Sequence, residues 1–505
     1  MAAITEQGRY YSRSFEVDPL GTAEAVLRLR DSLVEAGWEG EAFVDGGSRL
    51  TAVQELEQLS HPVLPLGVAD RLAAVDRTLA VAPRRVYAEL TLAEASELWS
   101  ARWQSIFRCL ERGGTPLTRF AVHLPGAASG SDLAAIQAVL SSALQSSEAP
   151  AIRGDGSLIH ITGETSWEAA CAAAAVVAPL RSEEIVVIRS GDHAALDGAL
   201  LGHGLRTQGL VSATPWRSAV QVLPLALELG FEPKDPYHVL ELLTLPVGPF
   251  QGRVGHELAR ALGDAPGIGG RPWESAKAKL GADDSRTDRA ASLRLVQEWL
   301  ETRAADPTEG ASKAALLAVV ARVRAWILSR IAKAPEDIPL LSAAQHCSAL
   351  SSALSSDPRQ TLTLAEVRKL RASVLSASGA AEVAPEQAGR VEHVASAAGL
   401  WAPRRVVVWW SFNDQAPPSQ RPPWRKPELL ALNRAGLVLP DPQRRLAEHA
   451  AAARRALACA TERVVLVSAG NAAGTSLGTH PLWDEIVARA GLDERSVSRL
   501  TVSCA

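Results

Sequence analysis

The sequence has 505 residues, of which 47% are hydrophobic and 21% charged, a composition typical of globular proteins and a length for roughly three domains. The net charge of −4 excludes a uniformly basic nucleic-acid-binding chain, so any site for a polyanion must be local. None of the seven lysines follows a glycine. This excludes the phosphate loop G-x-x-x-x-G-K-[ST], whose lysine must reach the β- and γ-phosphates, and with it ATP hydrolysis by that route.

Cysteine and histidine spacing gives no sign of a disulfide framework or a metal site. The five cysteines lie far apart without a C-x-x-C pair, and the eleven histidines form no pair at metal-ligand spacing. The first residues lack the basic and apolar regions of a signal peptide, and no window approaches the ~20 apolar residues of a membrane span. We expect a cytoplasmic protein without a membrane segment, metal or cofactor.

The first 150 residues are expected to form a mainly helical region. Apolar residues recur at helical spacing over residues 22–35, behind an N-cap threonine and before Gly37, and again over residues 92–112. No series of parallel strands is evident there.

Strands and helices alternate from residue 151. The pattern predicts strands at 157–161 and 185–189, each followed by a helix, at 167–180 and 194–202. Strand, helix, strand, helix is the order of a parallel sheet.

A long helical block then interrupts the alternation. Helices are predicted at 218–229, 236–245, 251–262, 287–303, 311–332, 340–354 and 363–377, and strands return at 391–395, 406–410 and 464–468 with a helix at 443–460. The order predicts an α/β domain at 151–214 and 385–490, a helical insertion at 215–384 and a tail at 491–505, because strands on either side of an insertion can share one sheet. A separate helical domain between two small α/β domains is the alternative.

Two short motifs match hydrolase and nuclease signatures only in part. Ser476 lies in a G-x-S-x-G pattern, but the preceding strand ends near 468 and no histidine lies beyond His480. Glu232 and Lys234 resemble the E-x-K half of a nuclease site, yet the intervening Pro233 argues against a strand. Both segments are interpreted as loops, with a small-molecule hydrolase using Ser476 as an alternative.

Residues 401–463 form a basic, aromatic segment. It holds eleven lysines and arginines against five acids, a local balance of plus six. Such a surface suits single-stranded DNA, whose phosphates pair with arginine while its bases stack on aromatic rings. The candidates are Arg421, Arg425, Arg444 and Arg445 for phosphates and Phe412 and Trp424 for bases. The alternative is a solvated basic helix face on a protein-interaction scaffold.

Several stretches of the chain resemble the AddB-type B subunits of bacterial helicase-nuclease repair complexes, described as PD-(D/E)XK nuclease family proteins. These stretches are 13–21 (RSFEVDPLG), 36–38 (AGW), 165–169 (TSWEA), 185–192 (IVVIRSGD), 214–217 (TPWR), 222–226 (VLPLA), 242–247 (LLTLPV), 265–270 (APGIGG), 406–412 (VVVWWSF) and 422–424 (PPW).

The resemblance implies a degenerate superfamily I helicase-like body that binds DNA without pumping it, next to an ATP-hydrolysing helicase subunit in double-strand-break repair. It places the loop 411–424 where such proteins face DNA. It also implies a RecB-like nuclease domain after the helicase-like body, for which this sequence has no counterpart. We therefore expect a short or truncated relative.

We predict that the 505-residue protein hydrolyses neither ATP nor DNA by itself. It lacks a phosphate loop with Gly-Lys, and it lacks the suitably spaced aspartate and E-x-K pair of a nuclease site. The measurement is phosphate release and degradation of linear DNA by purified protein with Mg²⁺. Magnesium-dependent loss of linear DNA would contradict the prediction.

Overall fold

The chain forms two compact units in a computed structural model. The structure describes residues 10–60, 66–120, 124–141, 150–190, 193–211, 217–281, 286–377, 382–384, 386–414, 423–439, 441–472 and 474–504. One unit, here the helical unit, comprises Arg13–Ala23 and Val211–Val383, and the other, the sheet unit, comprises Glu24–Leu210 and Ala384–Ala505. Among the described helices, none combines the length and apolar character needed to cross a bilayer.

The sheet unit is built on six parallel strands in the order β13-β3-β11-β10-β4-β9. The strands are β3 (Leu158–Thr165), β4 (Ile185–Arg189), β9 (Glu392–Val394), β10 (Arg404–Trp410), β11 (Ala460–Ala472) and β13 (Thr501–Cys504), and the short β12 (Thr475–Ser476) pairs antiparallel with β11. The expected α/β class with a mostly parallel sheet is therefore confirmed. The strands expected near 157, 185, 406 and 464 share this one sheet.

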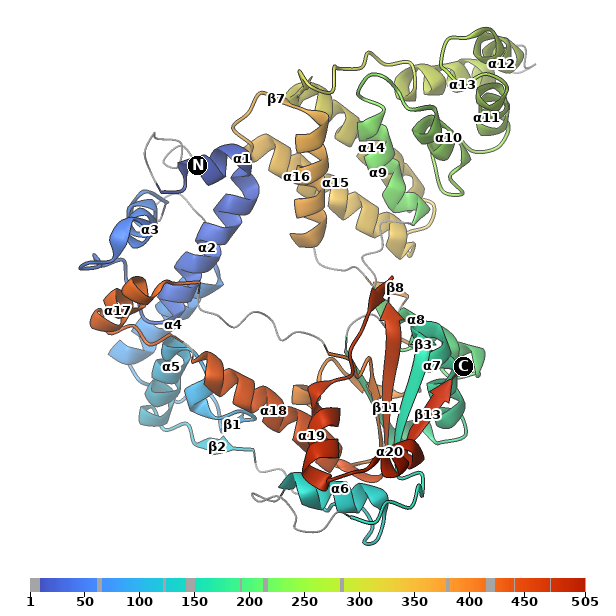
Figure 1. Cartoon of the computed structure of the whole chain (residues 1–505). Helices are drawn as coiled ribbons and strands as arrows, with labels where there is room; N and C mark the ends of the chain where they lie inside the picture. The colour runs from blue at the N-terminus through green and yellow to red at the C-terminus, as the bar shows by residue number, and fades with distance from the viewer. Residues whose placement is uncertain are drawn as a thin grey trace. The chain divides into compact units, whose positions relative to one another are not determined.

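Helices cover both faces of the sheet, so its strands are apolar on both sides. On one face, α7 (Ser166–Val177) and α8 (Ala194–Gly202) pack on side chains such as Val187 and Val408. On the other, α6 (Asp132–Ser141), α18 (Pro442–Ala458) and α19 (Pro481–Ala490) pack on the alternate positions, such as Ile188 and Val407. Figure 1 shows these two groups of helices on either side of β11.

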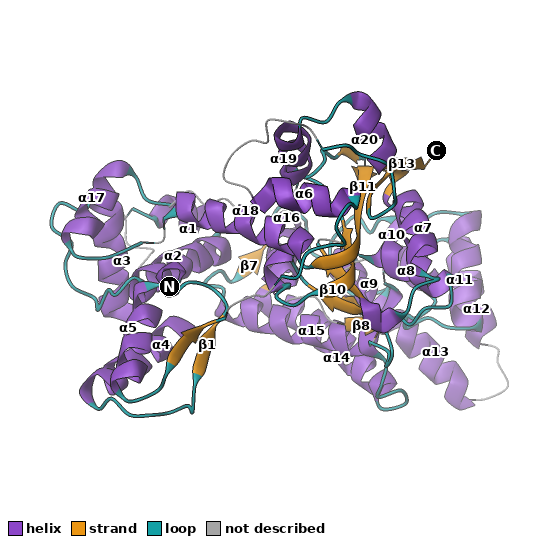
Figure 2. Ribbon diagram, turned by 90° about the horizontal axis from the view of Figure 1, so that it is seen from below, coloured by secondary structure: helices purple, strands orange, loops and turns teal. Residues whose placement is uncertain are grey.

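The amino-terminal part of the sheet unit is mainly helical, as its sequence indicates. Its helices are α3 (Gly47–Ser60), α4 (Val68–Val81), α5 (Ala101–Arg112) and most of α2 (Pro19–Glu35). It also contains a parallel pair that the sequence pattern did not indicate, β1 (Leu90–Leu92) and β2 (Leu117–Arg119), so the helix expected at 92–112 begins only at Ala101. Figure 2 shows this pair apart from the central sheet.

The amino-terminal helices are tied to the carboxy-terminal part of the same unit. Arg49 of α3 donates to both carboxylate oxygens of Glu428 in α17 (Lys426–Arg434), with Nε to Oε1 at 2.9 Å. Its guanidinium also lies 4.8 Å from the ring centroid of Trp424. Trp424 and Leu432 pack with Trp38 in the local core, so α17 belongs structurally to this helical layer.

The helical unit contains almost only helices among its described residues. They are α1 (Ser12–Val17), α9 (Ser218–Glu228), α10 (Pro236–Thr244), α11 (Arg253–Asp264), α12 (Arg271–Gly281), α13 (Arg286–Trp299), α14 (Lys313–Ile331), α15 (Ile338–Ser356) and α16 (Leu364–Ala377). The two-residue strands β6 (Ala311–Ser312) and β7 (Thr361–Leu362) pair antiparallel. At the edges of the segment lie β5 (Leu210–Val211) and β8 (Glu382–Ala384).

The expected tail at 491–505 differs from the structure. Residues Glu494–Leu500 form α20, and Thr501–Cys504 form β13, which pairs parallel with β3 and makes one edge of the sheet. The segment Thr-Val-Ser-Cys is short and half polar, and edge strands need only one apolar face, so its pattern resembles that of a loop.

A buried histidine joins β3 to the strands beside it. His160 Nε2 lies 2.9 Å from Ser468 Oγ of β11, and Ser468 Oγ donates its single proton to the carbonyl oxygen of Phe412 at 2.6 Å. His160 Nε2 must therefore carry the proton that it donates to Ser468. Burial lowers the pKa of His160 to about 4, because a second proton would give the ring a positive charge that water cannot solvate.

We predict that this histidine makes the protein less stable as the pH falls from about 6.5 to 4. The unfolded chain takes up the proton in this range whereas the folded chain does not, so at pH 4 the free energy of unfolding is lower by roughly 3 kcal/mol than at pH 8 from this group alone. Urea unfolding of wild type and His160→Gln across this range isolates the effect, because other titrating groups are common to both proteins. Parallel pH profiles for the two proteins would contradict it.

Candidate functional site

Helix α18 forms a wall shared by two pockets of the sheet unit. Asp441 accepts a hydrogen bond from the Gln443 backbone N–H and Pro442 occupies the first turn, which together start the helix at this point. Its apolar side, with Ala453 and Leu457, packs on the sheet. Residues of α18 that do not pack on the sheet line the pockets, and His449 lines both of them.

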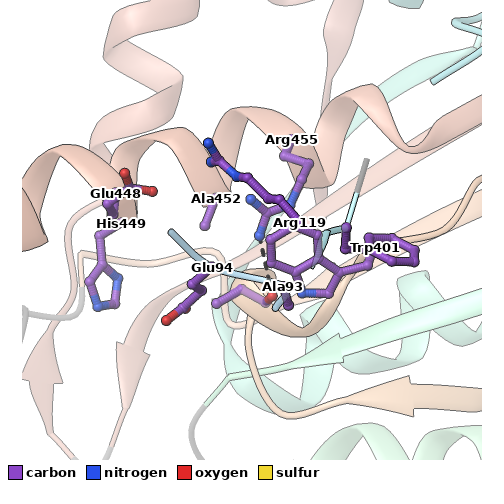
Figure 3. Close-up of a pocket in the computed structure, with 10 residues that line it drawn as sticks. Ala93, Glu94, Arg119, Trp401, Glu448, His449, Ala452 and Arg455 are labelled. Carbon is purple, nitrogen blue, oxygen red and sulfur yellow. Dashed lines mark hydrogen bonds between the residues drawn. The ribbon is translucent and has the colours of Figure 1, made fainter. Parts of the chain in front are cut away.

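The first pocket, here the aromatic pocket, has a volume of about 440 Å³. It is lined by Ala93, Glu94, Arg119, Phe120, Ala398, Trp401, Glu448, His449, Ala452 and Arg455. Figure 3 shows Glu448 and His449 at one end of the pocket and Trp401 at the other, with Arg455 reaching from α18 toward Trp401.

Arg455 is fixed against Trp401. Its guanidinium carbon lies 3.6 Å from the ring centroid, and its nitrogens donate to the carbonyl oxygens of Leu400 at 3.3 Å and Ala398 at 3.2 Å. Burial lowers the pKa of Arg455, yet an arginine of this kind keeps its proton at neutral pH. The pocket therefore contains a preorganised cation on an aromatic face.

Phe120 and Arg119 close the pocket from β2. The parallel pairing of β1 and β2 ends with the Phe120 N–H donating to the Leu92 carbonyl at 2.8 Å. The Phe120 ring meets Trp401 edge to face at 6.0 Å and is 43% exposed. Arg119 is exposed and makes no ion pair within the described residues. A flat ligand can stack on Phe120 while a phosphate reaches Arg119.

The second pocket, here the sheet-edge crevice, has a volume of about 340 Å³ at the carboxyl ends of β4, β9 and β10. It is lined by Ser190, Ser396, Ala397, Ala398, Trp409, Ser411, Asn413, Asp414, Leu446, His449, Ala450, Ala452, Ala453, His480, Pro481, Leu482 and Glu485. The chain leaves β4 toward α8 on one face and leaves the neighbouring β10 toward α18 on the other. Parallel sheets bind ligands at such a switch point.

The segment after β10 is held by hydrogen bonds to β11 and the loop before α19. Ser411 has a left-handed backbone with φ +56°, which is uncommon for a residue with a Cβ. Phe412 N–H donates to the Val467 carbonyl at 2.7 Å, and buried Asn413 donates to the carbonyls of Ala469 at 2.8 Å and Gly478 at 3.0 Å. These contacts impose the conformation of the segment that brings Asp414 to the wall of the crevice.

Both residues expected to stack on DNA bases are buried, which corrects that expectation. Phe412 is 0% exposed, between Trp409 and the parallel ring of His480. Trp424 is 5% exposed, under Arg49 in the core of the helical layer. An aromatic ring must expose a face to stack on a base, so neither can serve.

The basic segment is largely neutralised by carboxylates from elsewhere in the chain. Five of its arginines pair with acids outside residues 401–463, namely Arg404 with Glu392, Arg405 with Glu184, Arg434 with Asp45, Arg444 with Glu97 and Arg454 with Glu485. Of the arginines expected at DNA, Arg425 and Arg445 are exposed and without an ion pair among described residues, while Arg421 lies outside the described residues.

The hydrolase and nuclease motifs are not assembled into sites. Ser476 is exposed in β12, and no described histidine makes a hydrogen bond with its hydroxyl. Lys234 Nζ donates to the carbonyl oxygens of Leu300 at 2.7 Å and Thr302 at 2.8 Å, a structural role within the helical unit. Within the described residues, no group of three or more His, Cys, Asp or Glu could hold a metal ion.

Sequence reasoning missed Arg119 and Phe120, and it counted Trp401 and Arg455 without assigning them a site. Arg119 ends a three-residue strand that resembles a loop in sequence, and Phe120 follows it. The pocket brings together segments more than 270 residues apart, so spacing alone contained no signal for it.

We predict that Ser411→Gly is more stable than Ser411→Ala by about 1 kcal/mol, because glycine adopts the left-handed backbone without strain. Both variants remove the hydroxyl, so their difference reports the backbone alone. At Ser352, within α15, the two substitutions should have the opposite order, with the alanine variant more stable than the glycine variant by about 1 kcal/mol. Urea unfolding measures both pairs, and the same order at both positions would contradict the prediction.

Comparison of the chain with protein-family models and with curated proteins finds no match. The residues of the two pockets and the sequence patterns therefore supply the whole basis for a functional assignment.

Proposed function

We propose that this chain is a helicase-like, non-motor subunit that binds single-stranded DNA through the aromatic pocket. The observation that carries the proposal is the grouping of Phe120, Trp401, Arg119 and Arg455 in one pocket of about 440 Å³. An exposed ring stacks on any base, and a free arginine pairs with a phosphate, which together suit single strands of any sequence. Glu94 and Glu448 at the other end can accept hydrogen bonds from base amino groups.

The helicase-like assignment is supported by the order of the parallel strands and by the helical block between β4 and β9. Both agree with the AddB-type resemblance, which suggests an ATP-hydrolysing helicase subunit as partner and a role in cytoplasmic double-strand-break repair. A nuclease activity would have to come from another chain or domain.

The start of α7 supports a body without motor activity. In ATP-hydrolysing proteins with a phosphate loop, the helix after a strand presents free N–H groups to phosphates. Here Thr165 accepts a hydrogen bond from the Glu168 N–H at 3.3 Å, and Glu168 accepts one from the Thr165 N–H at 2.9 Å. This capping box uses the chain's own side chains where a phosphate would bind.

We predict that Arg119→Ala flattens the salt dependence of binding to a labelled oligo-dT, because one neutralised phosphate contributes a slope of about 0.7 in log affinity against log salt. Phe120→Ala should instead weaken binding by roughly 1–3 kcal/mol with little change in slope, since stacking releases no counterions. Fluorescence anisotropy at several salt concentrations measures both.

The control is Arg28→Ala, which removes an arginine of α2 whose side chain is 81% exposed and lies outside the pocket. If Arg119→Ala and Phe120→Ala bind like Arg28→Ala, the aromatic pocket is not the DNA site. A scaffold that contacts only proteins would then be the better description.

A further inference from the structure

The sheet-edge crevice differs from the aromatic pocket in charge. Among the described residues that line it there is no lysine or arginine, whereas Asp414 and Glu485 are present. Glu485 accepts hydrogen bonds from Arg454 Nε at 2.9 Å and from Arg489 at 3.1 Å, and neither arginine lines the crevice. Asp414 is exposed at the mouth, so the crevice disfavours an anionic ligand.

The start of α19 does not offer a phosphate site either. Pro481 has no N–H, the Leu482 N–H donates to His480 Nδ1 at 3.1 Å, and the Trp483 N–H donates to the His480 carbonyl at 2.8 Å. The backbone donors that usually bind a phosphate at a helix start are therefore absent or occupied.

His480 presents a hydrogen-bond donor in a fixed orientation. Its Nδ1 accepts from Leu482, so its proton lies on Nε2. The ring stacks on Phe412 with centroids 4.9 Å apart and planes at 18°, and lies 5.2 Å from Trp409. No described residue accepts from Nε2. The Asp414 backbone N–H bonds to the Gly478 carbonyl at 2.8 Å, which places a carboxylate acceptor on the neighbouring segment.

We propose that the sheet-edge crevice binds an unphosphorylated nucleoside. Its base lies against the apolar side chains of Trp409, Leu446 and Leu482, and its hydrogen-bonding edge meets His480 and Asp414. A ring nitrogen accepts from His480 Nε2, and the amino group beside it donates to Asp414. The hydroxyl groups of Ser190 and Ser396 remain for the sugar.

The same features disfavour the phosphorylated forms. A 5′-phosphate would enter a crevice where Asp414 has no ion pair with a described residue and no described lysine or arginine lines the wall. A base within a DNA strand would bring two phosphate groups. The volume of about 340 Å³ is within the range of about 300–1,000 Å³ for small-molecule sites. This inference does not depend on DNA binding, because it concerns a free ligand and because His480 and Asp414 do not line the aromatic pocket.

Isothermal titration calorimetry of the full chain with adenosine tests the proposal, with AMP and purine riboside as comparison ligands. AMP should bind at least tenfold more weakly because of its charge, and purine riboside at least tenfold more weakly because it lacks the amino group that meets Asp414. No heat of binding at millimolar adenosine, or AMP binding as tightly as adenosine, would overturn it.

His480→Asn and Asp414→Ala test the recognition itself. Asparagine at 480 keeps an acceptor for the Leu482 N–H, so α19 retains its cap while the Nε2 donor is lost. Each variant should weaken adenosine binding at least tenfold, whereas His203→Asn, at an exposed histidine outside the crevice, should not. Unchanged affinity in His480→Asn, or an equal loss in His203→Asn, would refute the assignment.

Discussion

The pairing of β10 between β4 and β11 is the contact on which the sheet unit depends. Val406 lies opposite Ile185 on one side and Arg463 on the other, and the register continues to Trp410. β10 follows β4 only after the whole helical segment, so these pairs join parts of the chain that are distant in sequence. Both faces of β10 are buried, and a shift by one residue would exchange Trp409 with Trp410 between the two cores.

The same register sets the positions around the two pockets. β10 ends at the carboxyl-terminal end of the sheet, where Ser411 turns the chain and Asn413 fixes it to β11. The helix that follows on the other face, α18, then runs beside this edge. One side of it faces a crevice lined by Asp414 and Glu485, and the other faces a pocket that contains two arginines as well as two glutamates. The chain thus presents two chemically different surfaces from one helix.

The sequence indicated those elements whose burial is complete or whose apolar spacing is regular. The first four residues of the run Ile-Val-Val-Ile-Arg are buried, and the observed β4 has the bounds expected from it. The helices α14 and α15 keep their apolar spacing over 19 residues each and were placed within two residues at either end. β13 and β1 are short and partly exposed, so no local pattern distinguishes them from loops.

The candidate site was less accessible to sequence reasoning, because burial and pairing are properties of the folded chain. Counting arginines in one segment could not show that carboxylates such as Glu184 and Glu97 come from distant positions to neutralise them. An aromatic residue that is next to arginines in the sequence can likewise lie either in a core or on a surface. Trp424 has an arginine over its face, but that arginine is Arg49 of a distant helix and the ring is buried.

The sharing of α18 has a thermodynamic consequence. Ala398, His449 and Ala452 line both pockets, so a substitution at any of them acts on both. If occupancy of one pocket displaces this wall, the affinity of the other changes, and linkage requires the two effects to be equal in free energy. The wall between the pockets is therefore also the route by which they would cooperate or compete.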